Sequence, residues 1–425
     1  MALMTRLGFL LAVMAVGFFG VLSCDSSDRS REWGGTVLDS AGIRVVHNTE
    51  EGLWCPGEGW TFTNALTIGA DEGDPAYVFG KITGVQVGPD GSIFVFDQMA
   101  SEIRVFDQTG THLRTLGGRG QGPGEFSPSA AGLFQMDDGN LVIPDLGNGR
   151  INWMSAEGEV LGSKVASYSG GFPVRWDSDG GGGVLVQRRA MGFNENPDLD
   201  AGDLLIRIGP DGNEETVVVL PKAKTVWMDG AAARFKYFET EPSWDLGPVG
   251  PLRTGMTQDY RIELRGGDGS IIGIITKPAP ARPVTNGDLD RFRGLMREAL
   301  DRMGLSPGAI DRQINNLSFG TSFPAFNQLM AGPDGTTLVQ RIAELSEIET
   351  LDLSEEMSRR LGAPTWDVFD AEGRFLGPVD LPLRFTPLVW HSDAVYGRWL
   401  DELDRAYVVK LNLVPGVPGT GAECR

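Results

Sequence analysis

Four charged residues lie at the same or a similar position after turns that contain Gly, and together with Arg189, which follows one of them, they could bind a charged ligand. Asp97 and Asp145 follow Asp-Gly pairs by the same spacing, and Arg341 holds the equivalent place after Gly335. Arginine binds carboxylate and phosphate groups well because its guanidinium group donates two parallel hydrogen bonds. The pattern predicts a binding face with acids on one side and an anion-binding arginine patch on the other; alternatively, each side chain caps its own turn or pairs with a neighbouring segment. The candidates are Asp97, Asp145, Arg188, Arg189 and Arg341.

No motif for catalysis or metal binding accompanies these residues. His47, His112 and His391 are scattered without the spacing of metal ligands, and the chain contains neither HExxH nor CxxC. It also lacks the GxSxG motif of a serine nucleophile, and the Gly-rich run 117–124 lacks the Lys-Ser/Thr pair of a phosphate-binding loop. We therefore predict no catalytic residues, no metal ligands and no cofactor.

The charge of the chain excludes one class of partner. Its 425 residues include 37 Lys and Arg against 57 Asp and Glu, which gives a net charge of −20. A protein that binds nucleic acid through phosphates needs a basic face, so we expect no nucleic-acid partner. With 41% apolar residues, the chain can bury a large core, either as one large all-β domain or as two ordinary domains.

An internal repeat indicates the elements that position the charged residues. Two segments between residues 82 and 164 align at a constant offset of 48 residues, so that IFVFD at 93–97 matches LVIPD at 141–145. Short apolar runs rich in β-forming residues alternate with Asp-Gly or Glu-Gly turns, in which Gly supplies the positive φ of a tight hairpin. A unit of this length with four short strands has the size of a propeller blade.

The positions of the turn signals predict the number of blades. The first hairpin turns are expected at 90–91, 138–139, 179–180, 247–250, 334–335 and 392–393. The second hairpin turns are expected at 110, 158, 211–212, 268–269, 372–373 and about 401–402. Both sets predict an all-β, six-bladed β-propeller, although the weak fourth unit leaves seven blades open. The run 42–46 has no unit of its own, and an N-terminal strand would complete the last blade and close the ring.

Four expansions of the chain are predicted to leave the ring from one face. Loops after the second and fourth strands of a meander leave on the same side, and the segments 117–131, 190–203, 277–322 and 342–365 all follow such strands. The apolar spacing from Leu289 to Met303 and from Ile310 to Leu317 predicts a helical hairpin at about 285–317. Loops on a rigid scaffold often carry function, so this face is the candidate for binding.

The N-terminus has the pattern of an export signal with a lipid-attachment cysteine. Arg6 precedes an apolar or Gly run from 7 to 22, which is short for a membrane-spanning helix. The segment VLSC at 21–24 resembles a bacterial lipobox, which implies acylation of Cys24; a simple signal peptide or an uncleaved anchor is the alternative. We predict a signal peptide at 1–23, a lipidated flexible tether at 24–34 and one propeller domain at 35–425.

The two remaining cysteines form an even set in an exported chain. Cys55 lies near the start of the folded part, and Cys424 lies one residue from the end of the chain. In an oxidising compartment such a pair predicts a disulfide that ties the termini together, while two unpaired thiols are the alternative.

Several motifs together resemble those of a bacterial family of secreted six-bladed β-propeller proteins. The run LGGRGQGPGEF at 116–126 is similar to the inter-blade signature of NHL-type repeats. VLDSAGIRV at 37–45, FPAF at 323–326 and VFDAEGRF at 368–375 occur in the order that this family shows, and the resemblance spans roughly residues 35–413. It implies a secreted propeller, and it implies no agreed biochemical activity.

Two functions from different classes follow. The first is a non-enzymatic module, tethered by the lipid on Cys24 to a membrane of the bacterial cell envelope, that recognises a protein, peptide or glycan on the expanded face. The alternative is a metal-dependent propeller hydrolase or lactonase, in which carboxylates near the central axis hold the ion, as some six-bladed relatives do. The absence of a recurring set of acids and histidines on the inner strands favours the first function.

Overall fold

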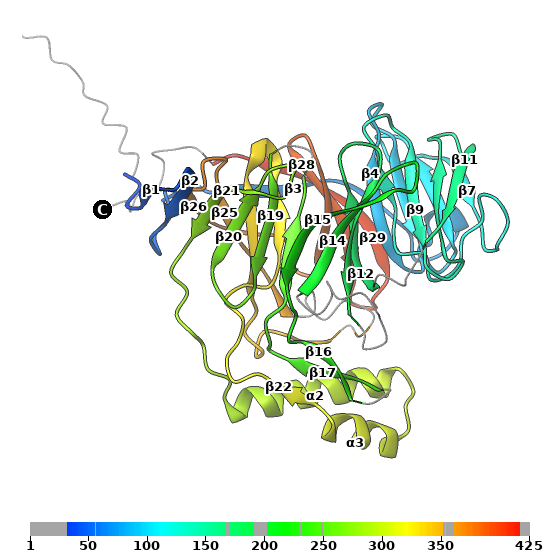
Figure 1. Ribbon diagram of the computed structural model, residues 1–425. Helices are drawn as coiled ribbons and strands as arrows, with labels where there is room; N and C mark the ends of the chain where they lie inside the picture. Colours follow the sequence, from blue (N-terminus) through cyan, green and yellow to red (C-terminus); the bar gives the residue numbers. More distant parts are fainter. Residues whose placement is uncertain are drawn as a thin grey trace, which may run out of the picture.

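The protein is a six-bladed β-propeller with a small cap on one face (Figure 1). The computed structural model describes residues 32–55, 57–166, 171–190, 202–229, 232–247, 250–351, 353 and 361–416. Within these residues six antiparallel sheets surround an axis, and a separate three-stranded sheet belongs to the cap. The prediction of six blades is confirmed, and no seventh blade occurs in the described part of the chain.

The blades follow one another in chain order, and in blades one to five the four strands run in sequence from the axis outward. Blade one comprises β4 (Ile82–Val87), β5 (Ile93–Asp97), β6 (Glu102–Phe106) and β7 (His112–Gly117). Blade two comprises β8 (Phe134–Gln135), β9 (Leu141–Asp145), β10 (Arg150–Met154) and β11 (Val160–Val165). Blade three comprises β12 (Phe172–Ser178), β13 (Val184–Arg189), β14 (Gly202–Ile208) and β15 (Glu214–Pro221).

The second half of the ring has the same plan with additions from the N-terminal segment. Blade four comprises β18 (Pro242–Asp245), β19 (Leu252–Met256), β20 (Arg261–Arg265) and β21 (Ile271–Thr276). Blade five comprises β23 (Leu329–Ala331), β24 (Thr337–Ile342), β25 (Gly362–Phe369) and β26 (Phe375–Asp380). Blade six comprises β27 (Phe385–His391), β28 (Ala394–Leu400), β29 (Ala406–Val414) and the N-terminal β3 (Thr61–Ile68).

Ring closure uses an N-terminal strand, as predicted, but that strand is β3. It pairs antiparallel with β29 from Thr61↔Val414 to Ile68↔Val408, so the outer edge of β29 is covered and β3 becomes the outermost strand of blade six. The run 42–46 instead lies in β2 (Ile43–His47), which forms a hairpin with β1 (Thr36–Ser40) and pairs parallel with β21 of blade four. The predicted turn at 401–402 therefore joins the second and third strands of blade six rather than the third and fourth.

Two-sided burial explains the continuous apolar runs of the middle strands. Along β5, Ile93 and Val95 pack into the cluster shared with blade six, whereas Phe94 and Phe96 pack into the cluster shared with blade two. Successive side chains of a strand point to opposite faces, so a strand between two blades is apolar at every position. One such cluster fills each of the six junctions between blades.

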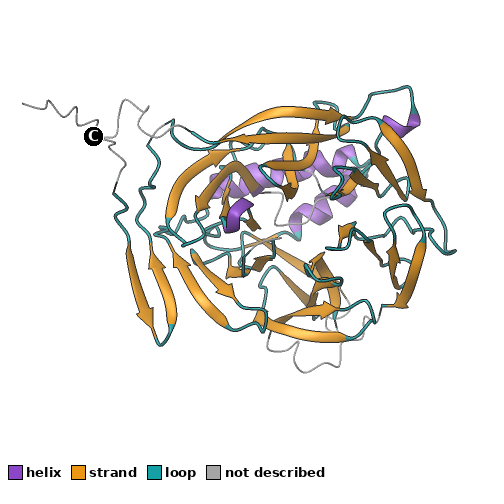
Figure 2. Ribbon diagram, turned by 90° about the horizontal axis from the view of Figure 1, so that it is seen from above, coloured by secondary structure: helices purple, strands orange, loops and turns teal. Residues whose placement is uncertain are grey.

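The expanded face, defined as the face from which the loops after second and fourth strands leave, carries the cap. The helices α2 (Asn286–Arg302) and α3 (Pro307–Asn315) form the predicted helical insertion, and they lie below the ring in Figure 1 and behind it in Figure 2. Thr285 and Asp288 form a reciprocal capping box at the start of α2. The cap also contains a hairpin that sequence analysis did not identify, β16 (Val226–Asp229) and β17 (Ala232–Tyr237), which is extended by β22 (Ser318–Phe319).

The predictions for the chain ends fall largely outside the described residues. Cys24 and Cys424 belong to that part of the chain, whereas Cys55 is buried. Gly416 lies against the backbone of Glu58, so the last described residues return to the segment that contains Cys55. The Cys55–Cys424 bond stays a prediction. Among the described residues, no helix has the length and apolar character required to cross a membrane.

Candidate functional site

A cavity of about 700 Å³ lies at the axis of the ring, and we call it the axial channel. The axial strand of each of the six blades contributes to its wall. Cavities of this size are typical of sites that bind small molecules or short chain segments. The channel is therefore the candidate site, and the loops and cap of the expanded face lie at one of its ends.

Three charged side chains meet in the channel wall between blades three and four. Arg175 and Asp177 lie on β12, and Asp245 ends β18. The Arg175 guanidinium forms an ion pair with Asp245 and lies 4.0 Å from the Asp177 carboxylate. Asp245 also accepts a hydrogen bond from the backbone N–H of Ala331 at 2.6 Å, and Arg175 stacks 4.8 Å from the ring centre of Trp244. These contacts hold all three groups in place before a ligand arrives.

The two carboxylates of this cluster do not both ionise at neutral pH. Burial and the adjacent Asp245 carboxylate raise the pKa of Asp177 to about 8, although Arg175 opposes the rise. A protonated Asp177 can donate a hydrogen bond to Asp245. Asp177 is then uncharged, and the positive charge of Arg175 balances the negative charge of Asp245. The cluster is thus nearly neutral below pH 8 and becomes anionic above it.

We expect that Asp177→Asn reduces the pH dependence of stability between pH 4 and pH 8. The raised pKa means that the folded protein keeps a proton that the unfolded chain releases above about pH 4, so this group stabilises the fold at low pH and the contribution is lost as pH rises towards 8. One such group contributes at most about 1.4 kcal/mol per pH unit. Urea unfolding from pH 4.5 to 8.5 measures this slope. The exposed Asp290→Asn variant is the control, and an unchanged slope in Asp177→Asn would contradict the assignment.

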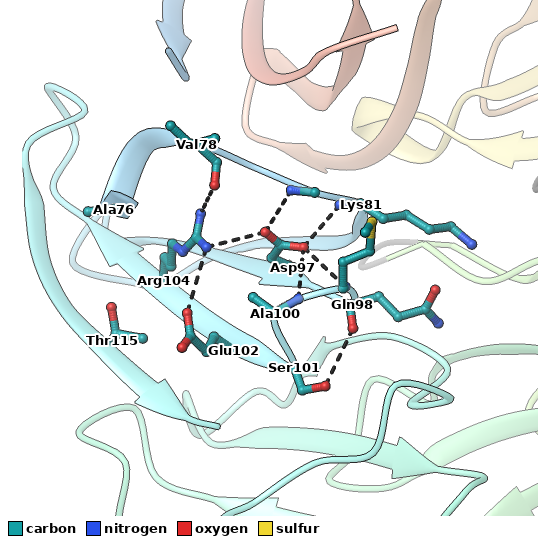
Figure 3. A network of polar contacts seen from close by, with 12 residues as sticks. Ala76, Val78, Lys81, Asp97, Gln98, Ala100, Ser101, Glu102, Arg104 and Thr115 are labelled. Atoms are coloured by element: carbon teal, nitrogen blue, oxygen red, sulfur yellow. Dashed lines mark hydrogen bonds and ion pairs between the residues drawn. The ribbon is translucent and has the colours of Figure 1, made fainter. Parts of the chain in front are cut away.

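Asp97, the first residue predicted for the binding face, is buried and holds its own turn (Figure 3). Its carboxylate accepts hydrogen bonds from the backbone N–H groups of Gly80 at 2.9 Å, Lys81 at 3.0 Å and Met99 at 3.2 Å. The Arg104 guanidinium lies 3.3 Å away and donates to the Val78 carbonyl. These contacts correspond to the alternative in which Asp97 caps its turn.

Asp145 occupies the equivalent place in blade two and makes the equivalent contacts. It is completely buried and accepts hydrogen bonds from the Ser127 hydroxyl, from the Ser127 N–H at 3.0 Å and from the Asn148 side chain at 2.7 Å. The repeat of 48 residues therefore carries a repeated capping arrangement that fixes the entry of each axial strand.

Each of the three predicted arginines has an acidic partner within the protein. Arg188 is buried and donates two parallel hydrogen bonds to Glu214, at 2.7 and 2.6 Å. Arg189 donates to Asp203 at 2.8 Å, and Arg341 donates to Asp367 at 2.9 Å. Burial raises the pKa of Asp203, although the adjacent Arg189 lowers it. An anion-binding patch at these arginines stays a prediction, and a ligand would have to compete with these carboxylates.

Sequence analysis missed the cluster of Arg175, Asp177 and Asp245. Asp177 comes shortly before a predicted turn, and Asp245 lies in the unit whose pattern was weakest. A signal did exist, since both acids precede first-hairpin turns at the end of an axial strand. The described residues contain no group of three or more His, Cys, Asp or Glu side chains that could hold a metal ion. The carboxylate ligand set of the hydrolase alternative is therefore not found in the part of the chain that the structure covers.

Comparisons with known proteins agree with the fold. Residues 76–151 match the family model DUF5128, described as a six-bladed β-propeller. No curated protein sequence matches the chain. A member of the DUF4221 family from Bacteroides vulgatus has a TM-score of 0.53 at 10% identity, with 85% of this chain and 100% of that chain covered.

Two other solved structures show lower similarity. A protein from Bacteroides fragilis assigned as exported has a TM-score of 0.48 at 9% identity, over 87% of this chain and 99% of that chain. A gluconolactonase from Xanthomonas campestris has a TM-score of 0.40 at 11% identity, over 83% of this chain and 99% of that chain. At such low identities these similarities establish nothing beyond the fold.

Proposed function

We propose that this chain is a non-enzymatic recognition module of the bacterial cell envelope that holds a segment of a protein, peptide or glycan at the axial channel. The observation that carries the proposal is the channel itself, which is about 700 Å³ in volume and receives one strand from every blade. Pairing of β3 with β29 joins the start of the propeller to its last blade, and a preorganised site loses less conformational entropy when it binds a ligand.

The cap supports binding on the expanded face. Its core joins residues of α2 and α3 to Tyr237 and Phe238, which follow blade three, and to Leu345, which follows the second strand of blade five. Insertions from three places in the chain thus pack into one body on the expanded face. The remaining turns of the propeller are short, so the additional chain is concentrated where a ligand would enter.

The location of the protein in the cell envelope is part of the same proposal. The export signal at 1–23 and the lipobox-like segment that ends at Cys24 support a lipid anchor in the envelope, facing the periplasm or the exterior. A charge of −20 provides no attraction to anionic lipid headgroups, so attachment to a membrane would depend on the acyl chains of the anchor.

Photo-crosslinking in the native envelope tests the function. A photoreactive side chain at Met330, which lines the channel, is expected to capture a partner, whereas the same side chain at the exposed Leu161 on an outer strand is expected to capture none. A Cys24→Ala form is expected to leave the membrane fraction. Adducts that are no more frequent at Met330 than at Leu161 would overturn the proposal. A stoichiometric bound metal ion in the purified protein would favour the hydrolase alternative instead.

A further inference from the structure

We propose that the segment held in the axial channel is an uncharged oligosaccharide that lies along the axis of the ring. This inference rests on the proposed function and selects the glycan among the ligand classes named there. Three features of the channel wall carry it: a balance of charges, carboxamide oxygens that accept no hydrogen bond within the protein, and apolar surface between these polar groups.

The charged side chains of the channel wall favour neither sign of ligand. Three basic and three acidic residues line the channel, and an ion pair joins Arg175 to Asp245. The six charges sum to zero when all are ionised and to +1 while Asp177 keeps its proton, so the wall has little net charge with which to select an ion. An uncharged ligand also avoids the cost of removing a charge from water. The six residues are Lys81, Asp137, Arg175, Asp177, Asp245 and Arg398.

Four glutamine side chains give the wall its free hydrogen-bond acceptors. Each Nε2 atom donates to an oxygen of the protein at 2.8 to 3.3 Å, and in three of the four this oxygen is a backbone carbonyl. Because a flipped carboxamide would place two oxygens against each other, these bonds fix its orientation. No described residue donates a hydrogen bond to the Oε1 atom of any of the four. They are Gln86, Gln98, Gln135 and Gln328.

These acceptors occur on opposite sides of the axis and at both ends of the channel. Gln135 belongs to blade two, and Gln328 comes directly before the axial strand of blade five, which lies across the ring of six. Gln98 follows β5 at the expanded face, where its side chain extends away from the Asp97 carboxylate (Figure 3). Gln86 lies near the first hairpin turn at the other end. The six residues of β4 span about 20 Å, so a ligand that reaches both ends is longer than one sugar ring.

Apolar side chains occupy the wall between the glutamines. Leu133, Met330 and Leu388 line the channel, as do the indole rings of Trp176 and Trp390. Aliphatic and aromatic groups suit the C–H faces of sugar rings. Both indole N–H groups are buried, and neither has a hydrogen-bond partner in the part of the chain that the structure describes. Unpartnered buried donors are rare because they are costly, and an oxygen-rich ligand in the adjoining channel would supply the missing acceptors.

The excess of acceptors favours a sugar chain over a peptide. Every hydroxyl group of a sugar can rotate and donate a hydrogen bond to a fixed acceptor. A peptide backbone brings as many carbonyl oxygens as N–H groups, and a carbonyl oxygen that faces a glutamine Oε1 atom gains no hydrogen bond. An ammonium-rich ligand would also supply donors, but the charges of the wall give it no advantage. The uncharged, donor-rich ligand is therefore the one that matches all three features.

The adduct formed at Met330 in the native envelope tests the ligand class without a choice of probe. After digestion with trypsin, we expect the peptide that contains the photoreactive side chain to carry a mass composed of sugar units. A polypeptide adduct without sugar would overturn this inference and leave the recognition function standing. Adducts no more frequent than those at Leu161 would refute both.

An array of immobilised oligosaccharides measures the preference for charge and length. The full-length protein in detergent is applied to uncharged, acidic and amino-sugar members of different lengths. We expect retention on uncharged oligomers and weaker retention on monosaccharides and on charged members. For a retained oligomer, raising the salt concentration tenfold should change the affinity by less than about 2-fold, because salt screens only charged pairs. Retention on no member, or a preference for charged members, counts against the inference.

Matched glutamine variants connect this binding to the channel wall. Gln135→Met and Gln328→Met each remove one acceptor and are expected to weaken binding of the retained oligomer about 5-fold, the effect of one hydrogen bond. Because the two positions lie on opposite blades, the double variant should lose roughly 25-fold. Gln108→Met, at an exposed turn outside the channel, is the control and should leave the affinity unchanged. If both single variants unfold at the wild-type temperature and bind with wild-type affinity, the glutamines do not contact the glycan and the inference is wrong.

Discussion

Replacing Asp367 by Asn is expected to lower the free energy of unfolding at pH 7 by about 3–5 kcal/mol, the usual cost of removing one partner from a buried ion pair. Asp367 lies in β25 of blade five with 1% of its side chain exposed. It accepts hydrogen bonds from the Tyr260 hydroxyl at 2.6 Å, from Lys277 Nζ at 2.9 Å and from Arg341 Nε at 2.9 Å. Asn would leave Lys277, which is only 10% exposed, without its counter-charge.

The loss of stability in Asp367→Asn should be larger at neutral pH than in acid. Burial alone would raise the pKa of Asp367, but Lys277 and Arg341 outweigh burial and hold that pKa below its usual value. The stabilisation is therefore present above about pH 4 and is lost as pH falls through the lower pKa of the folded state. The difference between the wild-type protein and Asp367→Asn should accordingly shrink in acid.

Urea unfolding at pH 7 and pH 3 measures both parts of this prediction. Asp290→Asn removes an exposed carboxylate from α2 and should change stability by less than about 0.5 kcal/mol. Adding Lys277→Met to Asp367→Asn removes the unpaired cation and should recover part of the loss. A difference below about 1 kcal/mol at pH 7 would contradict the role given to Asp367.

Replacing Asp97 by Ala is expected to cost at least about 3 kcal/mol of folding free energy, because four backbone N–H groups lose their acceptor and Arg104 loses a buried counter-charge. Asp145→Ala should cost about 2–3 kcal/mol for the same reason in blade two. Asn keeps one acceptor oxygen, so the Asn variants should lose less. Thermal and urea unfolding of the four variants provide the measurement.

The same variants separate a capping role from a binding role. A residue that only binds a ligand can be replaced without loss of stability, whereas a residue that caps a turn cannot. If Asp97→Ala and Asp145→Ala unfold at the wild-type urea concentration, the capping role is wrong and the predicted binding role gains support. The comparison matters because the two aspartates were identified by their repeated spacing, which both roles would produce.

The number of blades could be predicted from local signals. Asp-Gly turns need a residue with positive φ, and Gly91 and Gly139 have φ values of 82° and 85°. The first hairpin turn of every blade lies where these signals place it, because turn chemistry acts over four residues and needs no distant partner. Apolar runs such as IFVFD at 93–97 indicated strands, and the structure shows that this strand is buried on both faces.

The identity of the closing strand could not be predicted in this way. Thr61–Ile68 is mostly exposed, and its pattern is weaker than that of the run 42–46. Its place depends on the unpaired edge of β29, which lies more than 300 positions later in the chain. The hairpin of β16 and β17 was missed for a similar reason, since it is completed by β22 and by packing within the cap.

The amino-acid sequence by itself determined the turns, the short apolar strands, the helical insertion and hence a ring of six blades. Only the tertiary structure decided which charged groups meet. It pairs Arg188 with Glu214 and Arg341 with Asp367, and it brings Asp177 of blade three to Asp245 of blade four. The physical reason is the distance along the chain over which each interaction acts. Backbone turns depend on neighbouring residues. Ion pairing and desolvation depend on which side chains, distant in sequence, the folded ring brings within a few ångströms of one another.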